Sequence, residues 1–187
     1  MWSIHITKYL MHCSFMTQLI IINCNDFEDT IEYISSLQEM SYGNCDVYLI
    51  DSDSDNNECV KLQHDYGNAQ NIIVLLYETN LGLTKAHIKI WDDIIYKLDT
   101  RYFVLVNKDT NVNSNWLSEL ISFTNKEKIG IVSSEMIDYT NRHLMVNAGH
   151  KILNTREIIP IGFSEPVENY DSFENLGACG GSCLYKT

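Results

Sequence analysis

Apolar runs and helical repeats alternate along most of this chain. Strand-length segments with continuous apolar centres occur at residues 19–23, 46–50, 71–77 and 102–106. Between them, apolar side chains recur at helical spacing, which predicts a helix after residue 26, a short one ending at Gly67, and others over 84–97 and 114–125. Strands that are buried on both faces of a sheet have this unbroken hydrophobic character. We therefore predict an α/β fold, with a mainly parallel sheet and helices on both of its faces.

The alternation of strand and helix patterns changes in the last third of the chain. A fifth strand is predicted at residues 129–132, but after residue 134 the alternation stops, and proline and glycine residues break helices. Short strands are predicted at residues 145–151 and 157–161, before a polar loop and the glycine-rich segment 177–182. The C-terminal part is therefore predicted to be irregular and β-containing. The helix before the fourth strand is predicted to bury Ile88, Trp91, Ile95 and Leu98.

Composition narrows the class of protein. The chain has 187 residues, of which 45% are hydrophobic, which is enough to bury the core of one domain. Residues 1–16 are predicted to form an N-terminal extension and residues 17–187 the domain itself. A formal net charge of −12 argues against a nucleic-acid partner, because there is no basic surface to neutralise phosphates.

The chain carries no sequence signal for export or for crossing a membrane. Its longest apolar run near the start is far too short to span a bilayer, and no cleavage-site pattern accompanies it. The 6 cysteines lack the paired spacing of a zinc site and are predicted to be reduced thiols packed as small hydrophobic groups. We therefore predict a cytoplasmic protein without a transmembrane segment, which leaves peripheral membrane association open.

Polar side chains follow three of the predicted strands at the point where each strand ends. They form the segments 23–25, 51–55 and 107–109. The carboxyl ends of parallel strands meet at one edge of a sheet, and ligands bind in the crevice outside them. Taken alone, Asp109 fits a residue that caps a turn as well as it fits a ligand to a divalent cation. Three polar strand ends at one sheet edge favour the cation-binding interpretation.

Short motifs follow one another in a defined order after Met16. They are Ile-Ile-Ile-Asn-Cys-Asn at residues 20–25, Val-Tyr-Leu-Ile-Asp-Ser-Asp-Ser-Asp at 47–55, Asn-Leu-Gly-Leu at 80–83, Val-Asn-Lys-Asp-Thr at 106–110, Asn-Ala-Gly-His-Lys-Ile at 147–152 and Gly-Gly-Ser-Cys-Leu-Tyr-Lys at 180–186. In this order they resemble the inverting, nucleotide-sugar-dependent glycosyltransferases of family 2, especially their rhamnosyltransferase-like branch. The resemblance implies the GT-A fold, a Rossmann-like parallel sheet flanked by helices. Val-Asn-Lys-Asp-Thr stands at the position of the family's metal-binding DxD motif, with asparagine replacing the first aspartate.

The resemblance assigns the nucleotide of the donor to the first two motifs. It implies that Asp51 accepts a hydrogen bond from the ring N–H of a pyrimidine base, since an ionised carboxylate can only accept. Asn23 and Asn25 would frame the base pocket. Asp53 belongs to the same nucleotide-sugar site.

The next two motifs would hold the rest of the donor. The resemblance implies that Asn80 and Gly82 shape the nucleotide edge, where a glycine allows close approach of the backbone. Asp109 would ligate Mg²⁺ or Mn²⁺ bridging the diphosphate, and Asn107 would contact the ribose or a phosphate. Such a metal stabilises the charge that develops on the leaving diphosphate.

The acceptor side is only partly represented. The resemblance implies that the acceptor approaches near Gly180 and Gly181. An inverting transferase also needs a general base, normally a carboxylate, to deprotonate the acceptor hydroxyl. In this family that carboxylate lies downstream of the glycine-rich segment, so we expect it beyond Thr187. The chain therefore looks like the donor-binding part of a larger enzyme, or a truncated gene product.

The sequence thus favours a glycosyltransferase that moves a sugar from a UDP-, dTDP- or GDP-linked donor to a hydroxyl group. A glycan or a lipid-linked molecule would be the acceptor. One alternative is a catalytically incomplete module that only binds nucleotide sugars, and a weaker one is a flavodoxin-like binding protein. Another is a sugar nucleotidyltransferase, but the segment 23–25 leads into an acidic helix and lacks the basic, glycine-rich phosphate loop of that class.

Overall fold

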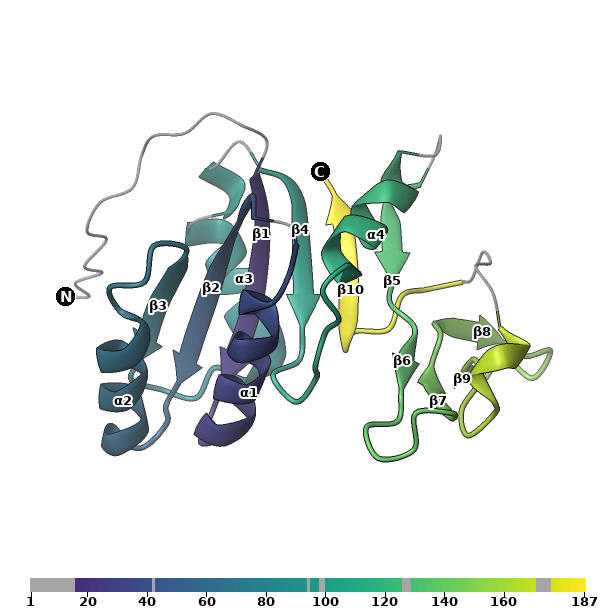
Figure 1. Ribbon diagram of the computed structural model, residues 1–187, viewed down its shortest axis with the longest axis horizontal. Coiled ribbons are helices and arrows are strands. Elements are labelled where there is room, and N and C mark those ends of the chain that lie inside the picture. Colours follow the sequence, from purple (N-terminus) through teal and green to yellow (C-terminus); the bar gives the residue numbers. More distant parts are fainter. Residues whose placement is uncertain (1–15, 42, 94, 98–99, 126–128, 171–175) are drawn as a thin grey trace.

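A six-stranded sheet forms the centre of the molecule (Figure 1). The computed structural model describes residues 16–41, 43–93, 95–97, 100–125, 129–170 and 176–187. The strands of the sheet are β1 (Met16–Asn23), β2 (Cys45–Ser52), β3 (Ile72–Tyr77), β4 (Thr100–Val106), β5 (Ile131–Ser133) and β10 (Ser182–Lys186). They lie in the order β3-β2-β1-β4-β10-β5; β1 to β4 are parallel, and β10 is antiparallel to both of its neighbours. The predicted, mainly parallel α/β fold is confirmed.

Helices cover both faces of this sheet (Figure 1). On one face lie α1 (Phe27–Gln38), α2 (Asn56–Tyr66) and α4 (Trp116–Thr124), and on the other lie α3 (Gly82–Asp93) and the 3-10 turn η1 (Ile95–Lys97). Strand β1 contributes to both layers, because Leu19 and Ile21 join the first core and Ile20 joins the second. A strand with two buried faces needs apolar residues at successive positions, which explains the unbroken runs in the sequence.

The register of α3 differs from the prediction. Its buried residues are Ala86 and Ile90, whereas Ile88 is 56% exposed. The prediction selected the bulky side chains and passed over Ala86, which lies one helical turn before Ile90 and is small enough to sit flat on the sheet. Trp91 is partly buried, with its ring edge against Phe103 at 4.9 Å between centroids. Ile95 is buried as predicted, and Leu98 lies outside the described residues.

Two small hairpins stand beside the main sheet, at the lower right of Figure 1. They pair β6 (Met136–Ile137) with β7 (Met145–Asn147), and β8 (His150–Ile152) with β9 (Ile158–Pro160), and are followed by the 3-10 turn η2 (Val167–Asn169). A separate core of Met145, Ala148 and Ile161 holds them together. The short strands predicted in this part of the chain are confirmed, with a break at Gly149, whose φ is 107°.

The final strand, β10, returns to the main sheet and was not predicted as a strand. It lies between β4 and β5, so the predicted fifth strand reaches the sheet only through it. Five residues after a glycine-rich segment carry too little periodicity to identify a strand from sequence. The consequence for function is geometric, because β10 brings the glycine-rich segment to the end of β4.

The remaining expectations concern chemistry and membranes. The described cysteines, Cys24, Cys45, Cys59, Cys179 and Cys183, are all free thiols. In the described part of the chain, no helix combines the length and apolar character that crossing a membrane requires. The predicted extension 1–16 lies outside the described residues, apart from Met16, with which β1 begins.

Candidate functional site

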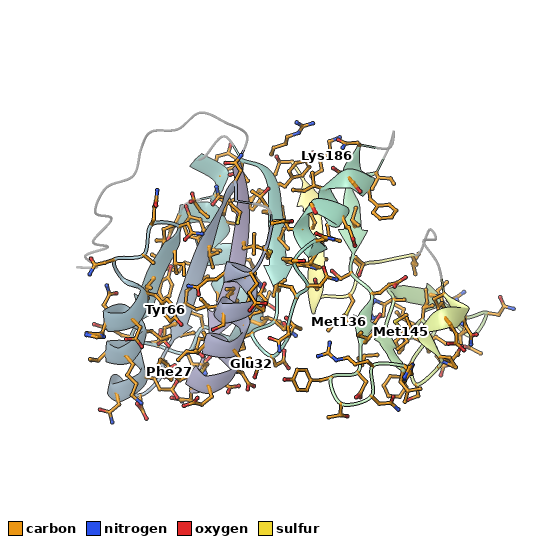
Figure 2. The ribbon with its side chains drawn as sticks, viewed as in Figure 1. Phe27, Glu32, Tyr66, Met136, Met145 and Lys186 are labelled. Atoms are coloured by element: carbon orange, nitrogen blue, oxygen red, sulfur yellow. The ribbon has the colours of Figure 1, made fainter. Side chains whose placement is uncertain are left out.

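The predicted site residues meet at the carboxyl edge of the sheet, the lower edge in Figure 1. Asn23 and Asp51, which end β1 and β2, are register partners. Asn80, which follows β3, donates from Nδ2 to the Cys24 sulfur at 3.3 Å. The Asn107 backbone N–H, which follows β4, donates to the Gly181 carbonyl at 2.9 Å. One continuous edge therefore joins all the predicted segments, and Phe27 and Glu32 of α1 flank it in Figure 2.

A buried network occupies the ends of β1 and β2. Asn23 and Asp51 are both 0% exposed. The Asn23 amide donates to Asp51 Oδ2 at 2.7 Å and to the Ser54 hydroxyl at 3.0 Å, and its oxygen accepts from the Thr30 hydroxyl at 2.9 Å. Asp51 Oδ1 accepts from the Ser54 backbone N–H at 3.2 Å and from the Cys59 thiol at 3.0 Å. A buried carboxylate is tolerated when its oxygens are bonded in this way.

This network places Asn23 and Asp51 beneath the open surface of the crevice. Their polar atoms bond to one another and to neighbouring protein groups, so they position the strand ends. Burial, followed by the hydrogen bond to Asp51, raises the pKa of the Cys59 thiol to about 12. The thiol therefore stays protonated and keeps donating to the carboxylate.

Asn25 and Asp53 form the exposed turns above that network. Both have left-handed backbones, with φ of 49° and 65°, a conformation that asparagine and aspartate tolerate better than most residues. The Asn25 backbone N–H donates to the Ser54 hydroxyl at 2.8 Å, and its side-chain oxygen accepts from the Asp55 N–H at 2.8 Å. The two turns are thus tied to each other, and both residues are exposed.

Asn80 and Gly82 form the entry to α3. The Asn80 side-chain oxygen accepts from the Gly82 N–H at 2.8 Å, and Gly82 has a φ of 63°. The Leu81 N–H donates to the Ser52 hydroxyl at 2.8 Å, which fixes this turn to the end of β2. A Cβ atom built on Gly82 meets no heavy atom within 4 Å among the described residues, so its backbone faces open space.

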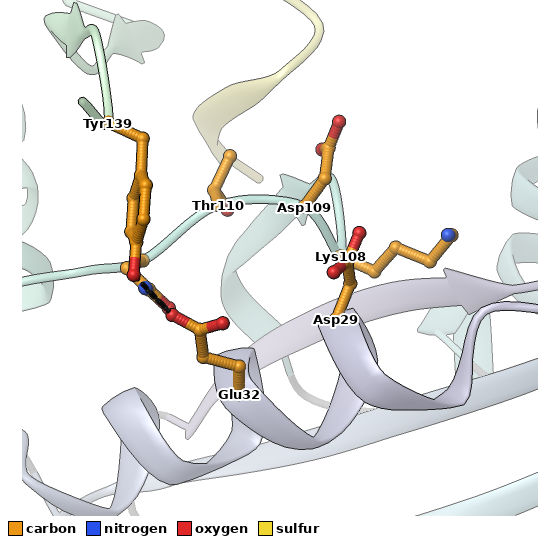
Figure 3. Close-up of a pocket in the computed structure, with 7 residues that line it drawn as sticks. Asp29, Glu32, Lys108, Asp109, Thr110 and Tyr139 are labelled. Atoms are coloured by element: carbon orange, nitrogen blue, oxygen red, sulfur yellow. Dashed lines mark hydrogen bonds between the residues drawn. The ribbon is translucent and has the colours of Figure 1, made fainter.

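The end of β4 is open and charged. Asp109 is exposed, and it lines a shallow hollow of about 140 Å³ together with Asp29, Glu32, Lys108, Thr110, Asn111 and Tyr139. Figure 3 shows the carboxylates of Asp29 and Glu32 rising from α1 toward this loop. The hollow is smaller than a typical pocket for a whole ligand, so it could hold only part of one.

Lys108 and Asp26 form an ion pair across the crevice that the sequence did not reveal. Asp26 follows β1, and Lys108 follows β4, 82 positions later. Partial burial lowers the pKa of Lys108, while the nearby Asp109 and Cys24 act in the opposite direction. The only local signal was the position of Lys108 between the two predicted ligands Asn107 and Asp109.

Tyr139 connects the first hairpin to α1. Its hydroxyl donates to Glu32 Oε1 at 2.9 Å, and the Asn111 amide donates to the same oxygen at 2.6 Å (Figure 3). These hydrogen bonds, that from Asn111 first, lower the pKa of Glu32. Tyr139 lies 107 positions from Glu32 and belongs to no motif, so no sequence signal could have indicated the contact.

The glycine-rich segment packs tightly beside the end of β4. Gly181 is buried, and a Cβ atom there would lie 2.7 Å from the Met136 side chain, so a larger residue would push the flexible end of that side chain aside. Gly180 is exposed. The predicted acceptor-side residues therefore lie next to Asn107, as the bond from Asn107 to Gly181 requires. Of the acidic residues just before this segment, Glu165 accepts from the Tyr170 hydroxyl at 2.5 Å.

The donor set at this edge fits a hard cation that is held partly by its ligand. Among the described residues, no group of three His, Cys, Asp or Glu side chains is arranged to hold a metal ion. Mg²⁺ is commonly bound by one or two carboxylates, with substrate phosphates and water completing its coordination. An exposed Asp109, two residues after an amide oxygen, fits that mode of binding.

The fold and the polar edge together define a Rossmann-like α/β domain with polar strand ends at one edge of its sheet. The strand order reverses between β1 and β4, and in such sheets ligands bind at the point of reversal. The profile of glycosyl transferase family 2 matches residues 18–186, and the chain belongs to this family. The family predicted from the motifs is therefore confirmed.

Solved glycosyltransferases share the fold. Similarity to S. aureus TarS 1–349 gives a TM-score of 0.59 at 15% identity and covers 91% of this chain and 47% of the TarS 1–349 chain. Similarity to the mannosyltransferase PcManGT from Pyrobaculum calidifontis, in complex with GDP-Man and Mn²⁺, gives 0.60 at 12% identity and covers 91% and 44%. TarS 1–349 in complex with UDP-GlcNAc gives 0.54 at 18% identity, covering 65% and 34%. These similarities confirm the GT-A fold.

The chain also matches part of a longer curated relative. The hyaluronan synthase of Streptococcus pyogenes is 28% identical over 109 residues, which is 56% of this chain and 25% of the synthase. The chain thus spans about a quarter of that relative and less than half of TarS.

Proposed function

We propose that this domain binds a nucleoside-diphosphate sugar along the carboxyl edge of its sheet and transfers the sugar, with inversion, to a hydroxyl group. The observation that carries the proposal is the open end of β4, where Asp109 is exposed and Asn107 bonds to Gly181, next to the strand reversal between β1 and β4. TarS and PcManGT, which have been solved with UDP-GlcNAc and with GDP-Man, support a nucleotide sugar as the ligand class. The rhamnosyltransferase-like branch stays a prediction.

The exposed residues of the edge are proposed to contact the donor. Asn25, Asp53 and Asn80 would line the nucleotide, and the open backbone at Gly82 would lie against its edge. Asn23 and Asp51 would act from beneath, because their polar atoms are already bonded within the protein. The contact between Asp51 and a pyrimidine base, implied by the motif, would require the Cys59 or Ser54 bond to be exchanged for one to the base.

The diphosphate would lie against the end of β4. Asp109 would hold Mg²⁺ or Mn²⁺ there, and Asn107 would donate to a phosphate or the ribose. When bound, such a cation stabilises the negative charge that develops on the leaving diphosphate. The protein's own part is to hold the sugar carbon so that an acceptor hydroxyl can attack from the opposite side.

The acceptor would approach over Gly180 and Gly181, which lie beside Asn107. A small, exposed residue at 180 leaves room for a glycan or a lipid-linked acceptor. The attacking hydroxyl must lose its proton to a general base, a task for a carboxylate near the reacting carbon.

Isothermal titration calorimetry with UDP-, dTDP- and GDP-sugars tests the proposal, each with Mn²⁺ and again with EDTA. We expect one nucleotide to bind preferentially, with Mn²⁺ strengthening its binding. No binding of any of the three would contradict the proposal. Binding without hydrolysis or transfer would favour the incomplete nucleotide-sugar-binding module instead, and a coupled assay for released nucleoside diphosphate separates these two outcomes.

A further inference from the structure

The two helix N-termini at the crevice are capped differently. Asp55, at the N-cap of α2, accepts from the Asn57 and Glu58 backbone N–H groups at 3.0 and 3.1 Å. Asp26 occupies the N-cap of α1, yet within this described segment its side chain makes no capping hydrogen bond. Its carboxylate is paired with Lys108 instead. An aspartate at this position normally bonds to the helix, so the first turn of α1 lacks a partner that is within its reach.

The Lys108–Asp26 pair lies where the proposed ligand would bind. Asp26 follows the end of β1, and Lys108 follows the end of β4, and these strands flank the point of reversal. Asp109 and Cys24 lie near the Lys108 ammonium, which places it among the polar strand ends. Cys24 in turn contacts Asn80. Lys108 therefore stands between the proposed nucleotide and metal positions.

Lys108 is a positively charged side chain among carboxylates at this edge. The other charged residues around the hollow are the carboxylates Asp29, Glu32 and Asp109, so Lys108 is the sole cation among the residues described as lining it. A diphosphate brought to this edge needs positive charge, and a lysine is a common phosphate ligand. The side chains of Lys108 and Asp26 are 20% and 39% exposed, and partly exposed ion pairs are weak enough to be exchanged for a phosphate.

We propose that the Lys108–Asp26 ion pair exists in the protein without nucleotide, and that Lys108 leaves Asp26 and binds the donor's diphosphate when the nucleotide binds. Asp26 is then free to accept from the backbone N–H groups at the start of α1, as Asp55 does for α2. This inference rests on the proposed function and adds a residue to it. Lys108 becomes the diphosphate ligand, and Asp26 sets how readily the ligand is released.

The proposal gives the two partners opposite effects on binding. Removing the charge of Lys108 removes a group that binds phosphate. Removing the charge of Asp26 removes the carboxylate that competes with the phosphate for Lys108. If the pair only fastens β4 to α1, either change breaks the same link and has the same sign. Lys108→Gln and Asp26→Asn therefore separate the two roles, and Lys108→Arg keeps the charge in a different shape.

The experiment compares the full chain and these variants by calorimetry with UDP and uridine, and with GDP and guanosine, in Mn²⁺ and in EDTA. The quantity of interest is the ratio of nucleotide to nucleoside affinity, which isolates the diphosphate. We expect Lys108→Gln to lower this ratio about tenfold in both buffers, since a charge-assisted hydrogen bond is lost. Lys108→Arg should retain most of it, and Asp26→Asn should raise it.

Each outcome decides between specific ideas. An unchanged ratio in Lys108→Gln overturns the proposal that Lys108 binds the diphosphate, while leaving the proposed function intact. Equal losses in Lys108→Gln and Asp26→Asn also overturn it and identify a fastening role. A wild-type chain that binds neither nucleotide overturns the proposed function, and with it the proposed role of Lys108. Thermal unfolding without ligand checks that each variant is folded, and Asp26→Asn still decides between the two roles if Lys108→Gln is not.

Discussion

The ends of β1 and β2 and the end of β4 lie along one edge of the sheet but are built differently. At β1 and β2, Asn23 and Asp51 are fully buried and bonded to each other. At β4, Asp109 is exposed, and Lys108 is partly exposed and forms an ion pair with Asp26. At the ends of β1 and β2 the polar groups bond to other protein groups, whereas at the end of β4 they are available to a ligand.

This difference shows that polar strand ends serve two purposes in one site. A rigid support is needed so that exposed groups stay in place when a ligand arrives, and buried hydrogen bonds provide that rigidity. The exposed groups must in turn remain incompletely bonded. The contrast leads to tests in which stability and binding should respond separately.

The largest effect is expected for Asp51→Ala. It removes a buried acceptor from Asn23, Ser54 and Cys59. Hydrogen bonds to a charged group each contribute about 1.5–3 kcal/mol, so we expect a loss of about 3 kcal/mol in the free energy of unfolding. For a domain of this size that corresponds to a fall of about 10 °C in Tm. Urea denaturation and calorimetry would measure both.

Asp53→Asn is the matched control, because asparagine tolerates the same left-handed backbone and the side chain is exposed. We expect it to change stability by less than about 0.5 kcal/mol. A different pattern would place Asp51 in the base pocket. Asp51→Ala would then weaken UDP and dTDP binding, spare GDP, and leave stability nearly unchanged.

The next effect concerns binding at the open end of β4. Asp109→Asn removes the charge from the exposed carboxylate and should lower the Mn²⁺-dependent affinity for the preferred nucleotide by about 10–100-fold, a range known even for residues behind metal ligands. The Tm of the metal-free protein should hardly move, because the side chain is exposed. Titration with and without EDTA measures the first quantity, and differential scanning fluorimetry the second.

Asp92→Asn on α3, also exposed, is a control that removes the same charge away from the sheet edge. It should change neither quantity. If Asp109→Asn instead caused a large loss of metal-free stability with unchanged Mn²⁺ dependence, Asp109 would be the cap of a turn, and the contrast with Asp51 would disappear.

Much of the fold follows from patterns visible in the sequence. The parallel strands were predictable because a strand with two covered faces must be hydrophobic at successive positions, as Leu19, Ile20 and Ile21 are. The register of α3 was not, because Ala86 contributes little hydrophobic signal although it packs flat on the sheet. Strand β10 escaped prediction because its placement depends on pairing with β4 and β5, which are distant in sequence.

The site was predictable as a place but not as a set of roles. Asn23 and Asn25 belong to one short motif, yet one is buried and the other exposed. That distinction arises from Ser54 and Thr30, which reach Asn23 from separate elements. The pairing of Lys108 with Asp26 likewise depends on the neighbouring positions of β1 and β4. Local sequence patterns do not contain such distant contacts.

A smaller effect on stability is expected at the N-terminus of α2, where Asp55 caps the helix. Asp55→Ala removes two hydrogen bonds at the start of α2 and should destabilise the protein by about 1 kcal/mol. Asp55→Asn should be nearly neutral, because asparagine is an equally good N-cap. Urea denaturation of both variants measures the difference. Equal losses would mean that the charge of Asp55 matters more than its capping geometry.

The smallest effect is a pH dependence that reports on the buried network. Burial and the bond to Asp51 raise the pKa of Cys59 to about 12, above that of a thiol in an unfolded chain. Its contribution to stability is therefore fully present below the unfolded pKa of about 8.5 and is lost as pH rises from there toward the folded value. Because Cys59 is only partly buried, we expect a decrease of less than about 1 kcal/mol in the free energy of unfolding.

Urea denaturation between pH 8 and pH 10.5, in ~0.5 unit steps, tests this with Cys59→Ser as the comparison. Serine keeps a hydroxyl that can donate to Asp51 but does not titrate in this range. Tyrosines and other thiols titrate in both proteins, so the difference between the two curves isolates Cys59. The wild-type curve should fall more steeply. Identical curves would mean that solvent reaches Asp51 Oδ1 and lets the thiolate form, and the ends of β1 and β2 would then be as open as the end of β4.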